Sequence, residues 1–314
     1  MKRLKFILII ILILSAVLGS CTDDRADMPD DGRIRIVTTI FPLYDFTREI
    51  TGDKASVRML LPPASESHSF EPSPQDIIEI QNCDIFIYVG GESDSWVKDI
   101  LESAETSEMK IIAVIECTEA AEEELLEGMQ QEEDSGEEAE YDEHIWTSPE
   151  NAALIVQYIS DAVCAADSEN ESIYRQNTYE YLKKLSILDA QFQKLSENAV
   201  RRVLVFGDRF PFRYFADAYG FECYAAFPGC STESEPSAST LRFLIDKVKT
   251  EKIPVIFHIE LSNKKIAGTI SEETGAKVLL LHSCHNISKE DFEAGRSYIE
   301  LMTENLNSLR EAVQ

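Results

Sequence analysis

Positive charge is scarce in this chain. Its 314 residues carry 29 lysines and arginines against 57 aspartates and glutamates, which gives a formal net charge of −28. Nucleic-acid binding needs a basic surface to neutralise phosphates, so this composition argues against DNA or RNA as a partner. The excess of carboxylates instead favours the attraction of cations.

Long apolar runs are also missing, except for one near the N-terminus. Basic residues at positions 2, 3 and 5 precede an apolar stretch at 6–18. This stretch falls short of the roughly 20 apolar residues that a transmembrane helix needs, so it predicts a secretion signal. It ends in Leu18-Gly19-Ser20-Cys21, the pattern of a lipoprotein cleavage site. A plain secretory signal is the alternative.

The lipoprotein interpretation divides the N-terminal segment into two parts. Residues 1–21 are the signal peptide with Cys21 as the lipidated residue, and the acidic residues 22–33 form a tether to the folded part. This predicts an extracytoplasmic protein anchored to the cell membrane by its lipid.

Histidine is rare, and two of the five histidines share one local context. His68 precedes the helix-start residues Ser73 and Asp76, and His144 precedes Ser148, with a proline directly after each serine. Serine followed by proline is typical of a helix N-cap and first turn. Either histidine alone is at least as consistent with an ordinary loop residue as with a metal ligand, but the repeated context predicts a metal site.

Apolar strands and helices alternate along the chain, which predicts an α/β fold with mainly parallel sheets. In such sheets ligands bind beyond the carboxyl ends of the strands, where His68 is expected. The expected strands are 34–38, 56–61, 85–89, 111–115, 203–206, 255–258 and 277–281, and the expected helices include 41–50, 96–101, 239–251, 263–273 and 292–312.

Two segments depart from this alternation. Residues 169–198 contain neither proline nor glycine and place apolar residues at steps of four and three, which predicts one long amphipathic helix. Residues 116–143 hold fourteen carboxylates and no lysine or arginine, so we expect a mobile acidic loop there.

The two histidine motifs resemble the metal-ligand motifs of solute-binding proteins of zinc and manganese ABC transporters. In that family a Pro-His-x-Tyr-Glu-Pro-Ser-like turn gives the first ligand and an Asp-x-His-x-Trp-x-Ser-Pro turn the second. His68 and His144 occupy those places, with Ser67 where the family often has proline. The resemblance runs from about Ile34 to the C-terminus.

The resemblance implies an architecture and a function. It implies an N-terminal lobe at 34–168 and a C-terminal lobe at 199–314, each with a mainly parallel sheet flanked by helices. One long rigid helix at 169–198 would join them and allow only modest closure. The implied function is capture of Zn²⁺, or alternatively Mn²⁺, and its delivery to a permease and its ATPase. We expect a monomer and no catalytic activity.

The C-terminal half departs from the family pattern at the ligand positions. Arg209 stands where the family has its third histidine, and a guanidinium offers no lone pair to a metal. The family usually has an aspartate where His282 stands, and imidazole is a sound replacement. The expected ligands are therefore His68, His144 and His282, with Asp208, His285 or water as the fourth donor.

His258, beside Glu260 at a strand end, is a weaker ligand candidate. The acidic loop has no histidine before His144, unlike the acid- and histidine-rich loops of related zinc-binding proteins, so a metal-gathering role is in doubt.

Six cysteines follow Cys21, and their pairing cannot be chosen from the sequence. Cys230 and Cys284 are each expected in a turn facing the cleft, where they form either a disulfide or two free thiols.

Two other functions compete with the receptor interpretation. A surface zinc metallohydrolase would need an activated water at an open metal position, but no His-Glu-x-x-His helix occurs and no general base follows either histidine motif. A surface adhesin is the other alternative. Three imidazoles favour zinc, whereas more carboxylates would favour manganese.

Overall fold

The fold consists of two four-stranded parallel sheets, one in each lobe. This computed structural model describes residue 28 and residues 31–67, 70–103, 109–129, 141–230 and 236–314. The first sheet has the strand order β2-β1-β3-β4 and the second β6-β5-β7-β8. The strands are β1 (Ile34–Thr38), β2 (Ala55–Met59), β3 (Ile85–Tyr88), β4 (Lys110–Ala113), β5 (Val203–Phe210), β6 (Glu222–Pro228), β7 (Val255–His258) and β8 (Lys277–Leu280).

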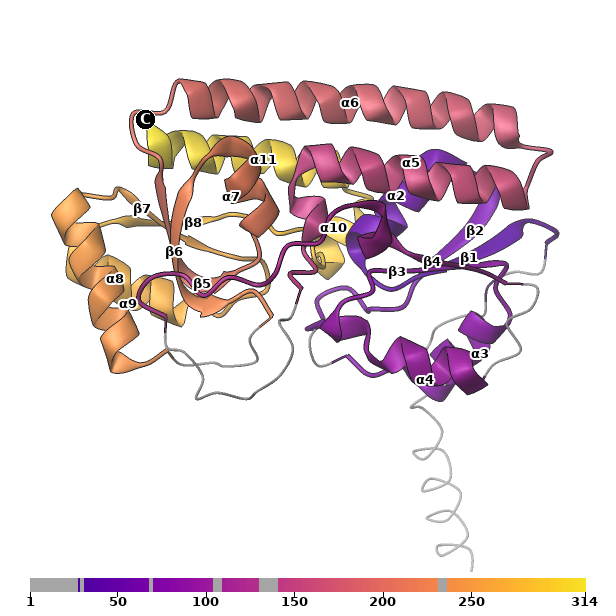
Figure 1. The fold of residues 1–314 in the computed structure, drawn as a ribbon, viewed down its shortest axis with the longest axis horizontal. Coiled ribbons are helices and arrows are strands. Elements are labelled where there is room, and N and C mark those ends of the chain that lie inside the picture. Colours follow the sequence, from indigo (N-terminus) through magenta and orange to yellow (C-terminus); the bar gives the residue numbers. More distant parts are fainter. Residues whose placement is uncertain (1–27, 29–30, 68–69, 104–108, 130–140, 231–235) are drawn as a thin grey trace, which may run out of the picture.

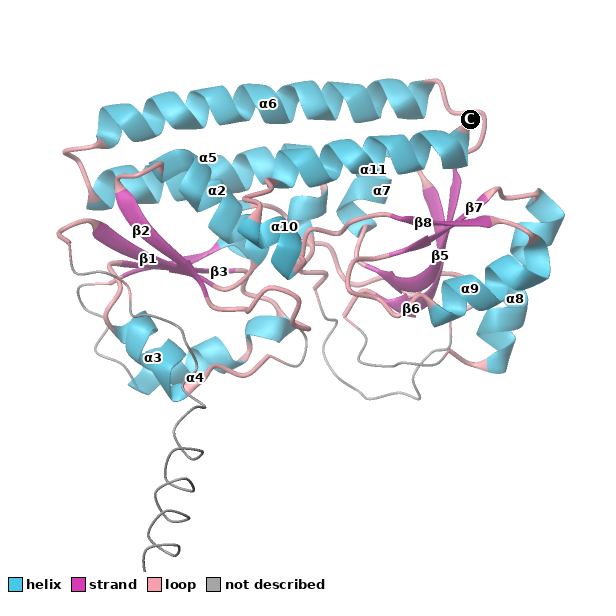
Figure 2. Cartoon of the chain, turned by 180° about the vertical axis from the view of Figure 1, so that it is seen from behind, coloured by secondary structure: helices cyan, strands magenta, loops and turns pink. Residues whose placement is uncertain are grey.

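Helices cover both faces of each sheet, as parallel sheets require. On one side α6 runs across both lobes, with α5 and α2 beneath it over the first sheet and α11 beneath it near the second (Figure 1). On the other side lie α3 and α4 in the N-terminal lobe and α8 and α9 in the C-terminal lobe (Figure 2). The helices are α2 (Phe41–Thr51), α3 (Pro74–Gln81), α4 (Trp96–Ser103), α5 (Pro149–Ala166), α6 (Glu171–Glu197), α7 (Arg213–Tyr219), α8 (Ala238–Glu251), α9 (Lys265–Thr274), α10 (Lys289–Glu293) and α11 (Tyr298–Val313). None of these described helices is both long and apolar enough to cross a membrane.

The expected helix starts are present. Ser73 and Asp76 form a reciprocal capping box at the start of α3. Ser148 accepts a hydrogen bond from the backbone N–H of Asn151 at the start of α5. Both motifs therefore begin helices, as the sequence predicts.

The long helix α6 joins the lobes and packs on both. Its buried stripe contains Tyr181, Leu185, Leu188, Phe192 and Leu195, the stripe that periodicity predicts. Each buried apolar side chain of this size contributes about 1.5–3 kcal/mol. The stripe belongs to one continuous apolar cluster that includes residues of both sheets. The lobes therefore share a core under α6, and this core restricts their relative motion.

Polar contacts also bind the N-terminal lobe to the last helix. Asp45 of α2 is buried, and it accepts a hydrogen bond from the backbone N–H of Tyr298 and pairs with Arg48. Burial raises the pKa of the Asp45 carboxyl to about 6 despite the opposing Arg48 charge. The Tyr298 hydroxyl donates to the Trp146 carbonyl oxygen at 2.6 Å. These contacts attach the start of α11 to the lobe that carries His144.

The helices and strands differ from the sequence-based expectation at three places. The strand β6 was not expected, because its sequence lacks the valine and isoleucine that mark the other strands. The short helix α7 was also missed. The single helix expected at 292–312 is two helices, since the chain turns at Gly295 with φ +70° and restarts at the capping box of Ser297.

We expect Tyr298→Phe to destabilise the fold by about 1–2 kcal/mol, because it removes a buried hydrogen bond while keeping the ring. Thermal and urea unfolding measure the change. Tyr179→Phe on the exposed face of α6 is the matched control and should lie within about 0.5 kcal/mol of the parent protein. Equal stability of the two variants would show that the hydroxyl contributes nothing to lobe attachment.

Candidate metal centre

A cavity of about 60 Å³ lies between the lobes. Its walls come from the carboxyl end of β5, from loops that follow β2, β5, β6, β7 and β8, and from the turn that carries His144. This is the position where open parallel sheets bind ligands. Polar side chains on the walls include Glu66, Ser67, His144, Asp208, Arg209 and His285.

His144 is held in one orientation by Asp142. The Asp142 Oδ1 atom lies 2.9 Å from His144 Nδ1 and also accepts the backbone N–H of His144 at 2.8 Å. A carboxylate can only accept here, so the imidazole proton resides on Nδ1 and the lone pair on Nε2. Burial is the largest single effect and opposes the protonated ring, but the charge and hydrogen bond of Asp142, together with the charges of Glu143 and Glu123, outweigh it and raise the His144 pKa above its ordinary value. A carboxylate that orients a histidine in this way is common next to metal sites.

His285 faces His144 from the other lobe. The two ring centroids are 5.3 Å apart and the rings are nearly perpendicular. Two imidazoles bound to one tetrahedral zinc at about 2.0–2.1 Å have centroids about 5 Å apart. Trp146 packs against both rings, and its indole N–H donates to the Ser283 carbonyl oxygen. The facing pair therefore has a separation that suits joint binding of one ion.

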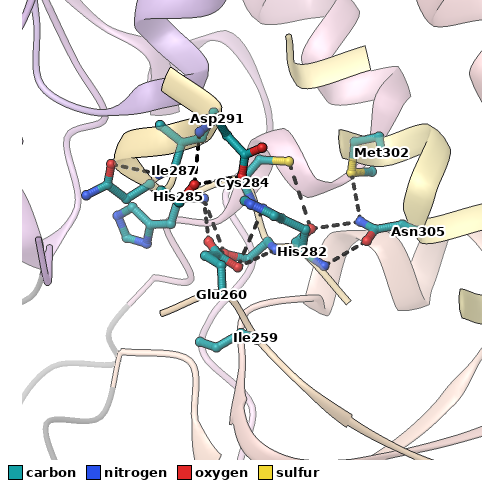
Figure 3. Close-up of polar contacts among 12 residues, drawn as sticks. Ile259, Glu260, His282, Cys284, His285, Ile287, Asp291, Met302 and Asn305 are labelled. Carbon is teal, nitrogen blue, oxygen red and sulfur yellow. Dashed lines mark hydrogen bonds and ion pairs between the residues drawn. The ribbon is translucent and has the colours of Figure 1, made fainter. Parts of the chain in front are cut away.

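His282 lies in the same turn but does not line the cavity. Its Nδ1 atom accepts the backbone N–H of Cys284 at 2.9 Å, so the lone pair on that nitrogen is already engaged. In the neutral ring the proton is then on Nε2. Figure 3 shows the His285 side chain pointing away from the network that joins His282 to Asn305.

Glu260 and Asn305 hold this turn from two sides. Glu260 accepts the backbone N–H groups of Ser283 and His285 and the Ser283 hydroxyl. Asn305 of α11 accepts the backbone N–H of His282 and donates to its carbonyl oxygen. Cys284 between them has a φ of +61°, a left-handed conformation that costs energy for a non-glycine residue. The turn is therefore fixed by its surroundings, with His285 on the cavity side.

Asp208 and Arg209 both line the cavity and have partners of their own. The two carboxylate oxygens of Asp208 accept the backbone N–H groups of Arg209 and Ile259. Arg209 Nη1 lies 3.4 Å from Glu66 Oε2 on the N-terminal side. Asp208 thus joins the ends of β5 and β7, and Arg209 forms an ion pair across the cavity.

Two residues singled out by sequence cannot be placed. His68 and Cys21 lie outside the described residues, although Ser67, next to His68, lines the cavity 3.4 Å from His285 Nδ1. His258 is described and lies off the cavity, with its Nδ1–H directed at the Ile259 carbonyl oxygen.

The described parts of the acidic segment contact the C-terminal lobe. The hydroxyl of Tyr214 in α7 accepts a hydrogen bond from the backbone N–H of Ala121 and donates one to the Asp142 carbonyl oxygen. Glu124 pairs with Arg213, and Glu123 accepts the backbone N–H of Cys230. The segment reaches from the N-terminal lobe to helix α7.

The sequence did not identify two residues beside His144 as possible metal ligands, although Cys230 was expected to face the cleft. Glu143 and Cys230 each place a ligand atom within 4.8 Å of one on His144. Glu143 is one of fourteen acids in its segment, so nothing in the sequence distinguishes it. Cys230 and Cys284 are free thiols, and the disulfide considered for them is absent.

Comparisons with known proteins identify a family and several relatives of this chain. The family described as zinc-uptake complex component A, periplasmic (ZnuA), matches residues 36–312. The chain is 32% identical to the zinc-binding lipoprotein AdcA of Streptococcus pneumoniae over 317 residues, which cover 99% of this chain and 61% of that protein. It is also 32% identical to the high-affinity zinc uptake system protein ZnuA of Bacillus subtilis over 96% of this chain and 94% of that protein.

A solved structure matches as well. The Zn(II)-bound ZnuA-like domain of Streptococcus pneumoniae AdcA superposes with a TM-score of 0.75 at 30% identity, covering 90% of this chain and 99% of that chain. This chain spans 61% of the length of the AdcA protein, so it corresponds to one part of that relative.

We expect Asn305→Ala to destabilise the protein by about 2–4 kcal/mol, because it leaves the buried N–H and C=O of His282 without this partner. Thermal unfolding measures the loss. Asn307→Ala, an exposed position on the same helix, is the control and should change stability by less than about 0.5 kcal/mol. A similarly small loss for Asn305→Ala would mean that Glu260 alone holds the turn.

Proposed function

The chain belongs to the zinc-uptake complex component A family, and from this membership we propose that it is the solute-binding receptor of a metal ABC transporter. It captures Zn²⁺ outside the cytoplasm and delivers it to a permease driven by its ATPase. The family is one of metal-binding transport receptors rather than enzymes. Zinc is the cargo here, not a resident cofactor.

The observation that carries this proposal is the facing pair of His144 and His285 at the interlobe cavity. Each ring comes from a different lobe, so an ion bound by both links the lobes. Release then requires only that the lobes separate slightly, which suits a receptor that must give up its ion. A hydrolytic site would instead need an open metal position with a general base beside it.

The proposed ligands are His68 and His144 from the N-terminal lobe and His285 from the C-terminal lobe. His285 takes the place that sequence reasoning assigned to His282, because the His282 Nδ1 is occupied by a backbone N–H and the ring lies off the cavity. Asp208 or water supplies the fourth donor, since Arg209 cannot.

Three nitrogen donors favour Zn²⁺ over Mn²⁺, which prefers oxygen-rich sites. Relatives that match nearly the whole of this chain are named for zinc, which supports the same choice. Lipidation of Cys21 would keep the receptor, as a monomer, on the outer face of the cell membrane near its permease. The lipoprotein name of the AdcA relative supports this location.

We expect His144→Ala and His285→Ala each to weaken zinc binding by about 100-fold or more, since about 10–16 kcal/mol of zinc binding energy is divided among four ligands. His282→Ala should bind within about threefold of the parent protein. Competition with a chromophoric chelator measures the affinities. The same two damaging variants should fail to restore growth of a deletion strain under zinc limitation.

His258→Ala is the matched control, because His258 is a buried histidine off the cavity. If His282→Ala rather than His285→Ala loses zinc, the ligand from the C-terminal lobe is His282. If neither variant changes binding or growth, the chain is not a zinc receptor of this design.

Proton competition at His144 provides a separate test. Because Asp142 raises the His144 pKa, zinc affinity should begin to fall at a pH above the ordinary histidine value of about 6.5. Asp142→Asn should lower that pH, since burial then dominates, and should weaken binding at pH 8 by about 10–100-fold. Asp99→Asn, an exposed acid on α4, should change neither. An unmoved pH profile in Asp142→Asn would contradict the assigned role of Asp142.

A further inference from the structure

Two metal-ligating side chains, those of Glu143 and Cys230, gather on one flank of His144. One ligand atom each of Glu143, His144 and Cys230 lies within 4.8 Å of the other two. Glu143 and Cys230 do not line the interlobe cavity. Cys230 follows β6, the edge strand of its sheet, whereas His285 follows β8 at the opposite edge. The cluster therefore lies to one side of the cavity, toward the acidic segment.

Close packing brings these groups together. The Glu143 carboxylate accepts hydrogen bonds from the hydroxyl and the backbone N–H of Ser93. It also fills the space that a side chain at Gly91 would occupy. A Cβ at Gly229 would lie 3.2 Å from the His144 ring and 2.9 Å from the Phe210 carbonyl oxygen. Only glycine there lets the backbone after β6 approach His144 this closely.

The Cys230 thiol is directed at the N-terminal lobe. Its Sγ atom lies 3.8 Å from Glu143 Oε1, and its backbone N–H donates to Glu123 of the acidic segment at 2.9 Å. The two lobes and the acidic segment thus meet at this cysteine. Glu143 and His144 are almost fully buried, and Cys230 is partly exposed, so solvent reaches the cluster from the cysteine side.

We propose that Glu143, His144 and Cys230 form a second cation site, which takes thiophilic divalent ions such as Zn²⁺, Cd²⁺ and Co²⁺ and rejects Mn²⁺. The donor set of sulfur, nitrogen and oxygen is one that zinc accepts, and a thiolate selects against manganese. On binding, the Cys230 thiol releases its proton to water and the sulfur forms the bond to the metal, with no change of oxidation state. The proposal rests on the proposed function only in sharing His144 with it.

The position suggests what this site does. It lies between the acidic segment, which attracts cations, and the interlobe cavity. Because His144 belongs to both sites, only one of the two sites holds an ion at a time. The site is an outer position from which an ion passes to the inner ligands by a change of partners around His144. It also supplies a sulfur donor from the C-terminal lobe, in which Arg209 occupies the position where the family has its third histidine.

Cobalt spectroscopy on the full chain tests the site directly, because only a thiolate ligand gives a sulfur-to-cobalt charge-transfer band in the near ultraviolet. The His285→Ala variant, which weakens the inner site, should bind one Co²⁺ and show this band. The double variant with Cys230→Ser should lose the band and about tenfold or more in Co²⁺ affinity. Cys117→Ser, at another partly exposed cysteine, should keep both in the same background. The titrations use a thiol-free reductant.

Glu143→Gln in the His285→Ala background provides a second variant that keeps the size of the side chain. It should retain the band but weaken Co²⁺ binding by about tenfold. Excess Mn²⁺ should leave the band unchanged. Co²⁺ binding without the band, or a band that survives Cys230→Ser, overturns the second site. If the proposed function is wrong, the result is different: His285→Ala then binds zinc with the affinity of the parent protein.

Discussion

The shared apolar core beneath α6 is the constraint on which the metal centre depends. A single cluster of buried side chains continues from the first sheet through the α6 stripe into the second sheet. The carboxyl ends of both sheets are thereby held facing one another, and the loops that follow them meet at one cavity. Separating the lobes widely would expose part of this core, at about 25 cal/mol for each Å². Small movements at the cavity cost much less, so capture and release are expected to involve local opening.

Within that frame, one turn selects the histidine that faces the other lobe. His282 and His285 are three residues apart, and both are imidazoles that could bind a metal. The His282 ring accepts a backbone N–H from Cys284 and so becomes part of the turn, while Glu260 and Asn305 hold the backbone. The left-handed Cys284 then directs His285 toward His144. The strain at Cys284 is tolerated because several buried hydrogen bonds determine the turn together.

Charge is distributed unevenly around the centre. Arg209 carries a positive charge on the cavity wall of a strongly acidic protein, and Glu66 from the other lobe lies opposite it. Pairs of this kind, with one partner partly in solvent, contribute about 0–1 kcal/mol, so this one does not fasten the lobes. On the other flank, Glu123 and Glu143 surround Cys230. Cys230 therefore lies among carboxylates, whereas Arg209 places its positive charge on the wall of the cavity.

The sequence by itself determined the parts of this protein that depend on local chemistry. The capped starts of α3 and α5, the buried stripe of α6, and seven of the eight strands follow from residue spacing within short windows. The surroundings of His144 also depend on nearby residues, since Asp142, which orients the His144 ring, is two residues away. The strand β6 was not predicted, because it is buried on both faces and its sequence lacks the spacing of β-branched residues that marks the other strands.

The tertiary structure alone decided which side chains meet. The choice of His285 over His282 depends on Glu260 and Asn305, which are distant in sequence and fix the direction of a single turn. The approach of Cys230 to Glu143 spans 87 residues and requires Gly229 to pack against His144. Periodicity reports which face of an element is buried, but it contains no information on the direction of a side chain in an irregular loop. The side chains that line the cavity stand on such loops, and so the fold was predictable while the way these side chains meet was not.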